Sequence, residues 1–121
     1  MVVAQEDFLP ESKLDLLQGT LDLMVLQTLA TMGTLHGFGL ARRIEQISEG
    51  ALELNQGTIY VALLRLQQKG WITAEWGTSA NRRRAKFYSI TKAGRKRLHE
   101  EVENWERVSS LMLRFLRLNE E

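Results

Sequence analysis

Apolar residues recur along this chain with two different periods, and the change between them separates a set of helices from a short hairpin. A helix is expected over residues 56–69, because its apolar residues recur at intervals of four and three. These residues are Ile59, Leu63 and Leu66. Asn55 is the expected N-cap, with Thr58 as the competing choice. Gly70 ends the helix, because glycine adopts a positive φ without steric cost.

The same periodicity indicates three further helices. One, over about 20–31, is apolar around most of its circumference, which is typical of a helix packed on more than one side. The second, over about 37–48, has one apolar and one charged face. The last helix runs from about 92 to 118 after a cap at Thr91 and would be on the order of 40 Å long. Gly94 is tolerated in its first turn.

Between the helix over 56–69 and the last helix the apolar pattern changes to strict alternation. Residues 71–76 are expected to form a strand, with Trp71 and Trp76 packing the hairpin onto the helices. Turn residues occupy 77–81, and a return strand is expected over 87–90. Three helices followed by a hairpin with a basic loop have the order of a winged helix-turn-helix.

The chain of 121 residues is expected to form a mainly α fold with a small β-hairpin. Residues 1–13 are polar and acidic and are interpreted as a flexible N-terminal arm. Residues 14–90 would form the winged helix-turn-helix domain, and residues 91–121 a C-terminal dimerisation helix.

Positive charge is concentrated in one segment, although the net charge is only +1. Eight of the 16 basic residues lie between Arg82 and Arg97, with no carboxylate among them. A local positive field suits the phosphates of nucleic acid. A solvated run of surface charge is the alternative, and the position of the segment at a hairpin tip argues against it.

Composition excludes several other classes of protein. No apolar run is long enough to span a bilayer, and the N-terminus lacks the pattern of a secretory signal. The absence of cysteine excludes disulfides and fits a cytoplasmic protein. With His36 and His99 as the only histidines and no catalytic or metal-ligand motif, neither enzymatic activity nor a cofactor is expected.

The helix over 56–69 carries the candidates for reading DNA on the face opposite its apolar stripe, with Tyr60 on the flank, since the major groove admits one helix. Gln56 suits adenine and Val61 a thymine methyl group, while Thr58 suits a base or a phosphate. Tyr60 suits a phosphate, and Arg65 a phosphate or a guanine. Capping is the alternative for Gln56 and Thr58, a half-buried ring for Tyr60, and a free surface charge for Arg65.

The basic loop supplies a second group of candidates, which would contact the DNA backbone or enter the minor groove beside the helix. They are Arg82, Arg83, Arg84 and Lys86. Because strand residues alternate in direction, these cations cannot all point at DNA. Arg82 and Arg84 are favoured.

The last helix carries a heptad-like apolar stripe that is too long for so small a domain to cover, so a second copy of the chain is expected to cover it. The interface residues would be Leu98, Val102, Trp105, Val108, Met112, Phe115 and Leu116. Trp105 lies in the middle of this stripe. It is either plain interface core or part of a pocket between the subunits in which a flat aromatic effector stacks.

These residues resemble the PadR family of bacterial transcriptional regulators. The matching blocks are QGTLDLMVL from Gln18, HGFGLARRI from His36, QGTIYVALLRL from Gln56, GWI from Gly70 and NRRRAKFYSITKAG from Asn81. Val61 stands where many members carry proline, and Phe38 where tyrosine is usual. The chain is most similar to short-tailed members with a single C-terminal helix, of an acidobacterial-like subgroup.

The resemblance implies a homodimer that represses transcription by binding a palindromic operator and is released by a small effector. Its partners would be double-stranded DNA, a second copy of itself and a small aromatic molecule, with no role for a membrane. A winged-helix module that binds other proteins rather than DNA is the competing interpretation, although such a module would not need three consecutive arginines in its loop.

Overall fold

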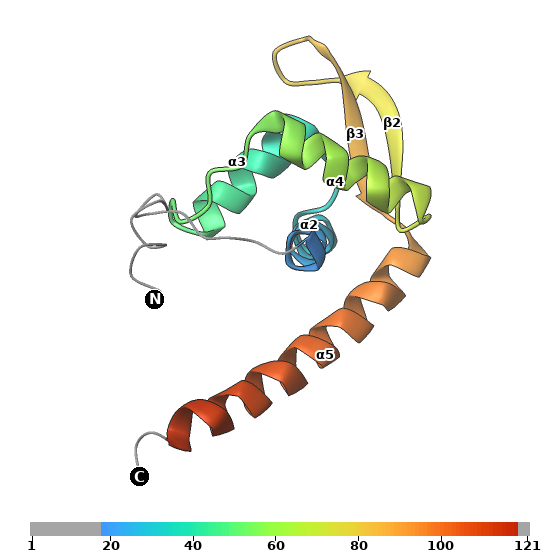
Figure 1. The fold of residues 1–121 in the computed structure, drawn as a ribbon. Coiled ribbons are helices and arrows are strands. Elements are labelled where there is room, and N and C mark those ends of the chain that lie inside the picture. The colour runs from blue at the N-terminus through green and yellow to red at the C-terminus, as the bar shows by residue number, and fades with distance from the viewer. Residues whose placement is uncertain (1–17, 119–121) are drawn as a thin grey trace.

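The computed structural model describes residues 18–118, which form four helices and one three-stranded antiparallel sheet (Figure 1). In chain order the elements are α2 (Gln18–Met32), β1 (Leu35–His36), α3 (Gly37–Ile47), α4 (Gln56–Gln68), β2 (Ile72–Thr78), β3 (Arg84–Ile90) and α5 (Lys92–Arg117). The expected fold class, a mainly α winged helix-turn-helix with a long last helix, is confirmed. The predicted N-terminal arm lies outside the described residues.

Three of the helices begin at a side chain that accepts a hydrogen bond from a backbone N–H in the first turn. His36 Nδ1 does this for α3 at 2.9 Å, and Thr91 Oγ1 does it for α5 at 3.0 Å. Asn55 Oδ1 accepts from the backbone N–H of Thr58 at 2.8 Å. Asn55 is therefore the N-cap of α4, and the competing choice of Thr58 was wrong.

Helix α2 lies at the centre of the fold, in contact with α3, α4, β3 and α5 (Figure 1). This position explains why its sequence is apolar on almost every side. The fully buried side chains of the core come from α2, α3, α4 and the base of the hairpin: Val25, Leu26, Leu29, Leu40, Ile59, Leu63, Leu66 and Ile72. The core thus packs α4 and the base of the hairpin against the central helix α2.

The sheet has the strand order β1–β3–β2. The two-residue strand β1 was not expected, because it is too short to show an alternating pattern. β2 and β3 both reach further toward the loop than predicted, so that Thr78 pairs with Arg84 and the predicted turn over 77–81 begins too early. No helix among residues 18–118 is long and apolar enough to cross a membrane.

The first turns of α5 belong to the core of the same chain. Leu98 is 8% exposed and packs within the core, and Val102 packs at the edge of that core. The prediction that Leu98 lies in a subunit interface was therefore wrong, because its own domain already covers it. Beyond this point α5 extends away from the domain (Figure 1).

The start of α5 is pressed against the chain that leads into β2. The backbone N–H of Thr91 donates to the carbonyl oxygen of Trp71 at 3.0 Å, and its hydroxyl donates to the carbonyl oxygen of Gly70 at 2.7 Å. A Cβ on Gly94 would overlap that Trp71 oxygen and would lie 2.8 Å from Ile90 Cγ1. Close approach of the backbone therefore requires glycine at 94, where the sequence indicated only that glycine is tolerated.

Candidate nucleic-acid interface

The N-terminal half of α4 presents an exposed face on the side away from the core. Gln56, Thr58, Tyr60 and Val61 all lie on it, with more than half of the Tyr60 and Val61 side chains in contact with solvent. The cap of this helix is formed by Asn55, so the hydroxyl of Thr58 is not used for that purpose. These four predicted contact residues are therefore at the surface of a helix whose other face is anchored in the core.

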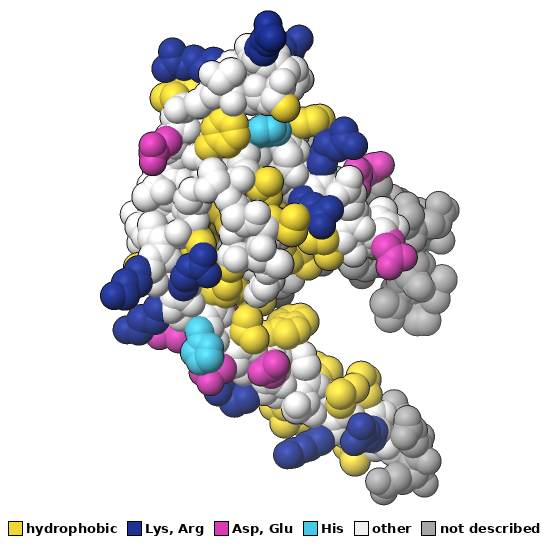
Figure 2. Space-filling model, turned by 180° about the vertical axis from the view of Figure 1, so that it is seen from behind, with side chains coloured by type: hydrophobic (Ala, Val, Ile, Leu, Met, Phe, Trp, Pro, Cys, Tyr) yellow, Lys and Arg dark blue, Asp and Glu magenta, His cyan; other side chains and the backbone are white. Residues whose placement is uncertain are grey.

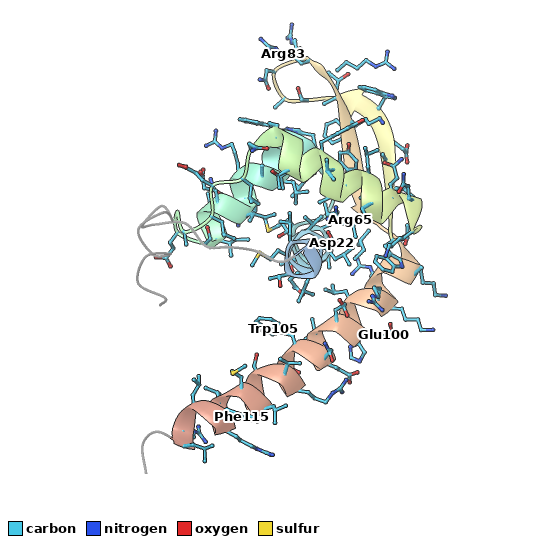
Figure 3. The ribbon with its side chains drawn as sticks, viewed as in Figure 1. Asp22, Arg65, Arg83, Glu100, Trp105 and Phe115 are labelled. Atoms are coloured by element: carbon cyan, nitrogen blue, oxygen red, sulfur yellow. The ribbon has the colours of Figure 1, made fainter. Side chains whose placement is uncertain are left out.

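Arg65 does not lie on that exposed face. Its guanidinium points at the carboxylate of Asp22 on α2, with Arg65 Nη2 2.6 Å from Asp22 Oδ1 and Nε 3.3 Å from Oδ2 (Figure 3). The two side chains are 21% and 16% exposed. The prediction of an outward-facing Arg65 was wrong, because a bidentate ion pair holds the guanidinium between the two helices. Arg65 fixes α4 to α2 instead.

The loop between β2 and β3 and the strand ends that flank it, residues 76–86, are together called the wing, and the tip of the wing is ordered. The backbone N–H of Ser79 donates to the Arg83 carbonyl oxygen at 2.8 Å, and that of Arg82 donates to the Ser79 carbonyl oxygen at 2.9 Å. Arg82 adopts a positive φ of 61°, which directs the chain back toward β3. Arg82 and Arg83 are both exposed at this tip, as predicted, and Figure 3 shows Arg83 there.

Arg84 and Lys86 lie on the strand rather than in the loop, and they share one face of the hairpin. Lys86 pairs with Trp76, and Tyr88, two residues further along β3, is buried on the same face. The wing cations of β3 therefore continue the face of the hairpin that packs against the helices. They project past the end of the core, toward the side on which α4 is exposed.

The basic residues of segment 82–97, which are close in sequence, form two separate groups in the structure. β3 spans seven residues, which separates the wing cations from the basic start of α5 by roughly 20 Å. Figure 2 shows Lys and Arg side chains over the wing and a separate group near the start of α5. Because this distance exceeds the screening length of about 10 Å in 0.1 M salt, the two groups act as separate fields. The wing group adjoins the exposed N-terminal half of α4, whereas Arg97 at the start of α5 lies beside the other end of that helix, over the Trp71 ring that Lys69 also contacts.

A cleft of about 280 Å³ lies between the start of α3, the start of α4 and the wing. Gln56 and Tyr60 contribute to it from α4, and Trp76 and Lys86 from the wing. Burial raises the pKa of the Tyr88 phenol at its floor, and the neighbouring Tyr60 phenol raises that pKa further. Tyr88 therefore stays neutral near pH 7 and does not offset the positive charge of the wing.

Two exposed aromatic residues on this cleft were missed or misplaced by sequence reasoning. Phe38 is 57% exposed, and Arg42 Cζ lies over its ring, 5.9 Å from the ring centroid. Trp76 is 58% exposed, so the prediction that it packs onto the helices was wrong, whereas Trp71 does pack against the core. Alternation along β2 does place Trp76 on the face of the hairpin that packs against the helices, but at that point the strand extends beyond the core.

Comparison with known proteins identifies the family. The sequence model of the transcriptional regulator PadR-like family matches residues 25–100, which is more than half of the chain. The chain belongs to this family. It is accordingly a DNA-binding transcriptional regulator, and the matched segment includes all of α4 and the wing.

Solved structures of transcriptional regulators have the same fold. A transcriptional regulator from Clostridium thermocellum is 26% identical, with a TM-score of 0.73 over 81% of this chain and 91% of that one. A PadR-like regulator from Bacillus cereus is 25% identical, with a TM-score of 0.71 over 83% and 94% of the two chains. An uncharacterised protein from Lysinibacillus sphaericus is 26% identical over 84% of this chain and 93% of its own length.

The PadR-like chain has a second exposed surface on the outer part of α5. This surface, called the α5 face, consists of Trp105, Val108, Met112, Phe115 and Leu116, each about half exposed or more. It adjoins an apolar groove of about 450 Å³ between α2, α3 and α5, which is lined by Met24, Ile47, Val102 and Trp105 among others. Trp105 projects from α5 toward the space beneath α2 (Figure 3).

Proposed function

We propose that this protein is a homodimeric repressor that binds a palindromic operator and acts in the cytoplasm. The observation that carries the DNA contact is that the exposed face of α4 and Lys86 of β3 border the same cleft. A strand of DNA backbone in this cleft would meet Lys86 on one side and Tyr60 on the other. The helix would then lie in the adjoining major groove.

Within this arrangement the residues of α4 divide into base-reading and backbone-contacting groups. Gln56, Thr58 and Val61 are the candidates for base edges, and Tyr60 donates its hydroxyl to a phosphate. Arg65 takes no part, because it is already paired with Asp22. Specificity is therefore assigned to short side chains near the start of α4.

The wing cations supply affinity rather than specificity. Arg82 and Arg83 at the tip would contact phosphates or enter the minor groove, and Arg84 and Lys86 would contact the strand that passes through the cleft. Because the described part of the wing and β3, residues 78–90, contains no carboxylate, these charges are available to phosphate oxygens.

Replacing both Arg82 and Arg83 with alanine should weaken binding to every DNA sequence by a similar factor. Each lost phosphate contact lowers the slope of log K against log salt by about 0.9, so the double variant should lose about 1.8 from the slope. Fluorescence anisotropy with operator and random duplexes at several salt concentrations measures both quantities.

Arg95→Ala with Lys96→Ala is the matched control, because it removes the same charge from the start of α5, which lies beyond the end of β3 that is remote from the wing. The control should retain most of the wild-type slope. Equal losses in the two double variants would contradict the assignment of the wing. An absence of salt-dependent binding in the wild type would instead favour the protein-interaction module.

The second copy of the chain is assigned to the α5 face. A stripe of large apolar side chains on a helix that leaves its own domain is stable in water when another apolar stripe covers it. A parallel or antiparallel pair of α5 helices would cover both stripes at once and set two α4 helices on one side of a duplex. A palindromic operator matches such a two-fold arrangement.

A small aromatic effector is assigned to the groove at Trp105, where its ring would stack on the indole. A planar phenolic acid that binds there should raise the melting temperature of the wild type and leave that of a Trp105→Ala variant unchanged. Thermal-shift screening of phenolic acids and aromatic drugs measures this difference. Equal stabilisation of both proteins by every compound that binds would contradict the assignment of this pocket.

A further inference from the structure

Trp76 occupies a place on the wing that burial does not explain. It is 58% exposed, lies on β2 and pairs with Lys86 across the hairpin. An indole left mostly in water forgoes most of the stabilisation that its burial would provide. The side chain therefore serves some purpose other than packing the core.

Two cations of the wing lie over the Trp76 ring. Arg84 Cζ is 4.6 Å from the ring centroid, and Lys86 Nζ is 5.6 Å from it. Both distances are within the range of about 6 Å over which a ring attracts a cation. The register explains the arrangement, because Lys86 is directly opposite Trp76 and Arg84 is the next residue of β3 on the same face.

The ring orients these cations without neutralising them. No acidic residue occurs between Trp76 and His99, and Glu75 points to the opposite face of β2 by alternation. Arg65 differs, because Asp22 not only orients its guanidinium but also forms an ion pair with it. Arg84 and Lys86 are therefore available to form ion pairs with an incoming phosphate.

We infer that Trp76 is a positioning residue that holds Arg84 and Lys86 in place beside the cleft before DNA arrives. Long side chains lose rotamer freedom when they bind, and cations that are already held lose less of it. This inference rests on the proposed DNA-binding function and assigns the wing a residue that acts through its neighbours.

The test is a double-mutant cycle measured by DNA affinity. Trp76→Ala should weaken operator binding roughly tenfold, given two exposed cation–ring contacts, and Trp76→Phe should restore most of the loss because it retains a ring. In a background that carries Arg84→Ala and Lys86→Ala, the same Trp76→Ala change should have almost no further effect, because its partners are already absent. Trp76→Leu provides an apolar side chain without a ring and should behave like the alanine variant.

The outcomes separate this inference from the proposed function. Equal losses in the two backgrounds would mean that Trp76 contacts DNA itself, and wild-type affinity in Trp76→Leu would mean that it positions nothing. Either result would overturn the inference. If the wild-type protein shows no salt-dependent binding to duplex DNA, the proposed function fails before the cycle is measured. Melting temperatures of all variants exclude a loss of fold as the cause of weaker binding.

Discussion

Glutamates at Met112 and Phe115 should convert the protein into a folded monomer with greatly weakened operator binding. Both side chains are about half exposed or more on the α5 face, so the substitutions remove nothing from the core of the chain. Buried in a pair of helices, however, the carboxylates would be desolvated and would repel each other. Loss of the second DNA-reading unit should lower operator affinity by about 10²- to 10⁴-fold, because the two units no longer bind as one.

Analytical ultracentrifugation gives the oligomeric state, and fluorescence anisotropy gives the affinity for the same sample. The matched control is Ser110→Glu with Arg114→Gln, which makes the same change in net charge on the polar side of α5, beside Glu103 and Arg107. The control should remain dimeric and bind the operator. A double glutamate variant that stays dimeric would show that a different surface joins the subunits.

Alanine at Gly94 should be strongly destabilising. The added methyl group would overlap the backbone oxygen of Trp71, which cannot rotate away as a side chain would. Overpacking against such a fixed group should lower the free energy of unfolding by about 3 kcal/mol. For a domain of this size the melting temperature should fall by about 10 to 15 °C.

The comparison is Gly19→Ala, where a Cβ has no atom within 4 Å and alanine favours a helix more than glycine does. That variant should melt at or slightly above the wild-type temperature. Both variants are measured at one protein concentration, because any association between copies of the chain would contribute to the melting temperature. A Gly94→Ala protein that melts with the wild type would show that α5 can move away from Trp71 without cost.

The elements that periodicity reveals were predicted well from the sequence. The apolar face of α4, its cap at Asn55 and the cap of α5 at Thr91 all depend on residues close in the chain, and the structure has them as expected. The strand β1 was missed because its stability comes from pairing with β3 rather than from its own two residues. Local pattern therefore indicates most of the fold but not the parts that exist only through tertiary contact.

The errors at the candidate site have the same origin. Helical periodicity places Arg65 on the face of α4 opposite its apolar stripe, and only the position of α2 reveals that Asp22 pairs with it. Likewise the apolar stripe of α5 does not specify which neighbour covers it, and its own domain covers Leu98. The contacts to DNA, to a second subunit and to an effector remain predictions, because they depend on molecules outside the chain.

The Asp22–Arg65 ion pair has a consequence for how the protein could respond to a ligand. Helix α2 carries Asp22 toward α4, while its Leu23 and Met24 line the groove at Trp105. Helix α2 thus forms a wall of the groove and also holds α4 in place through the ion pair. If the proposed dimer and effector site are correct, a molecule that widens the groove would tilt α4 in both subunits, and the two α4 helices would no longer match half-sites spaced at about 34 Å along the duplex.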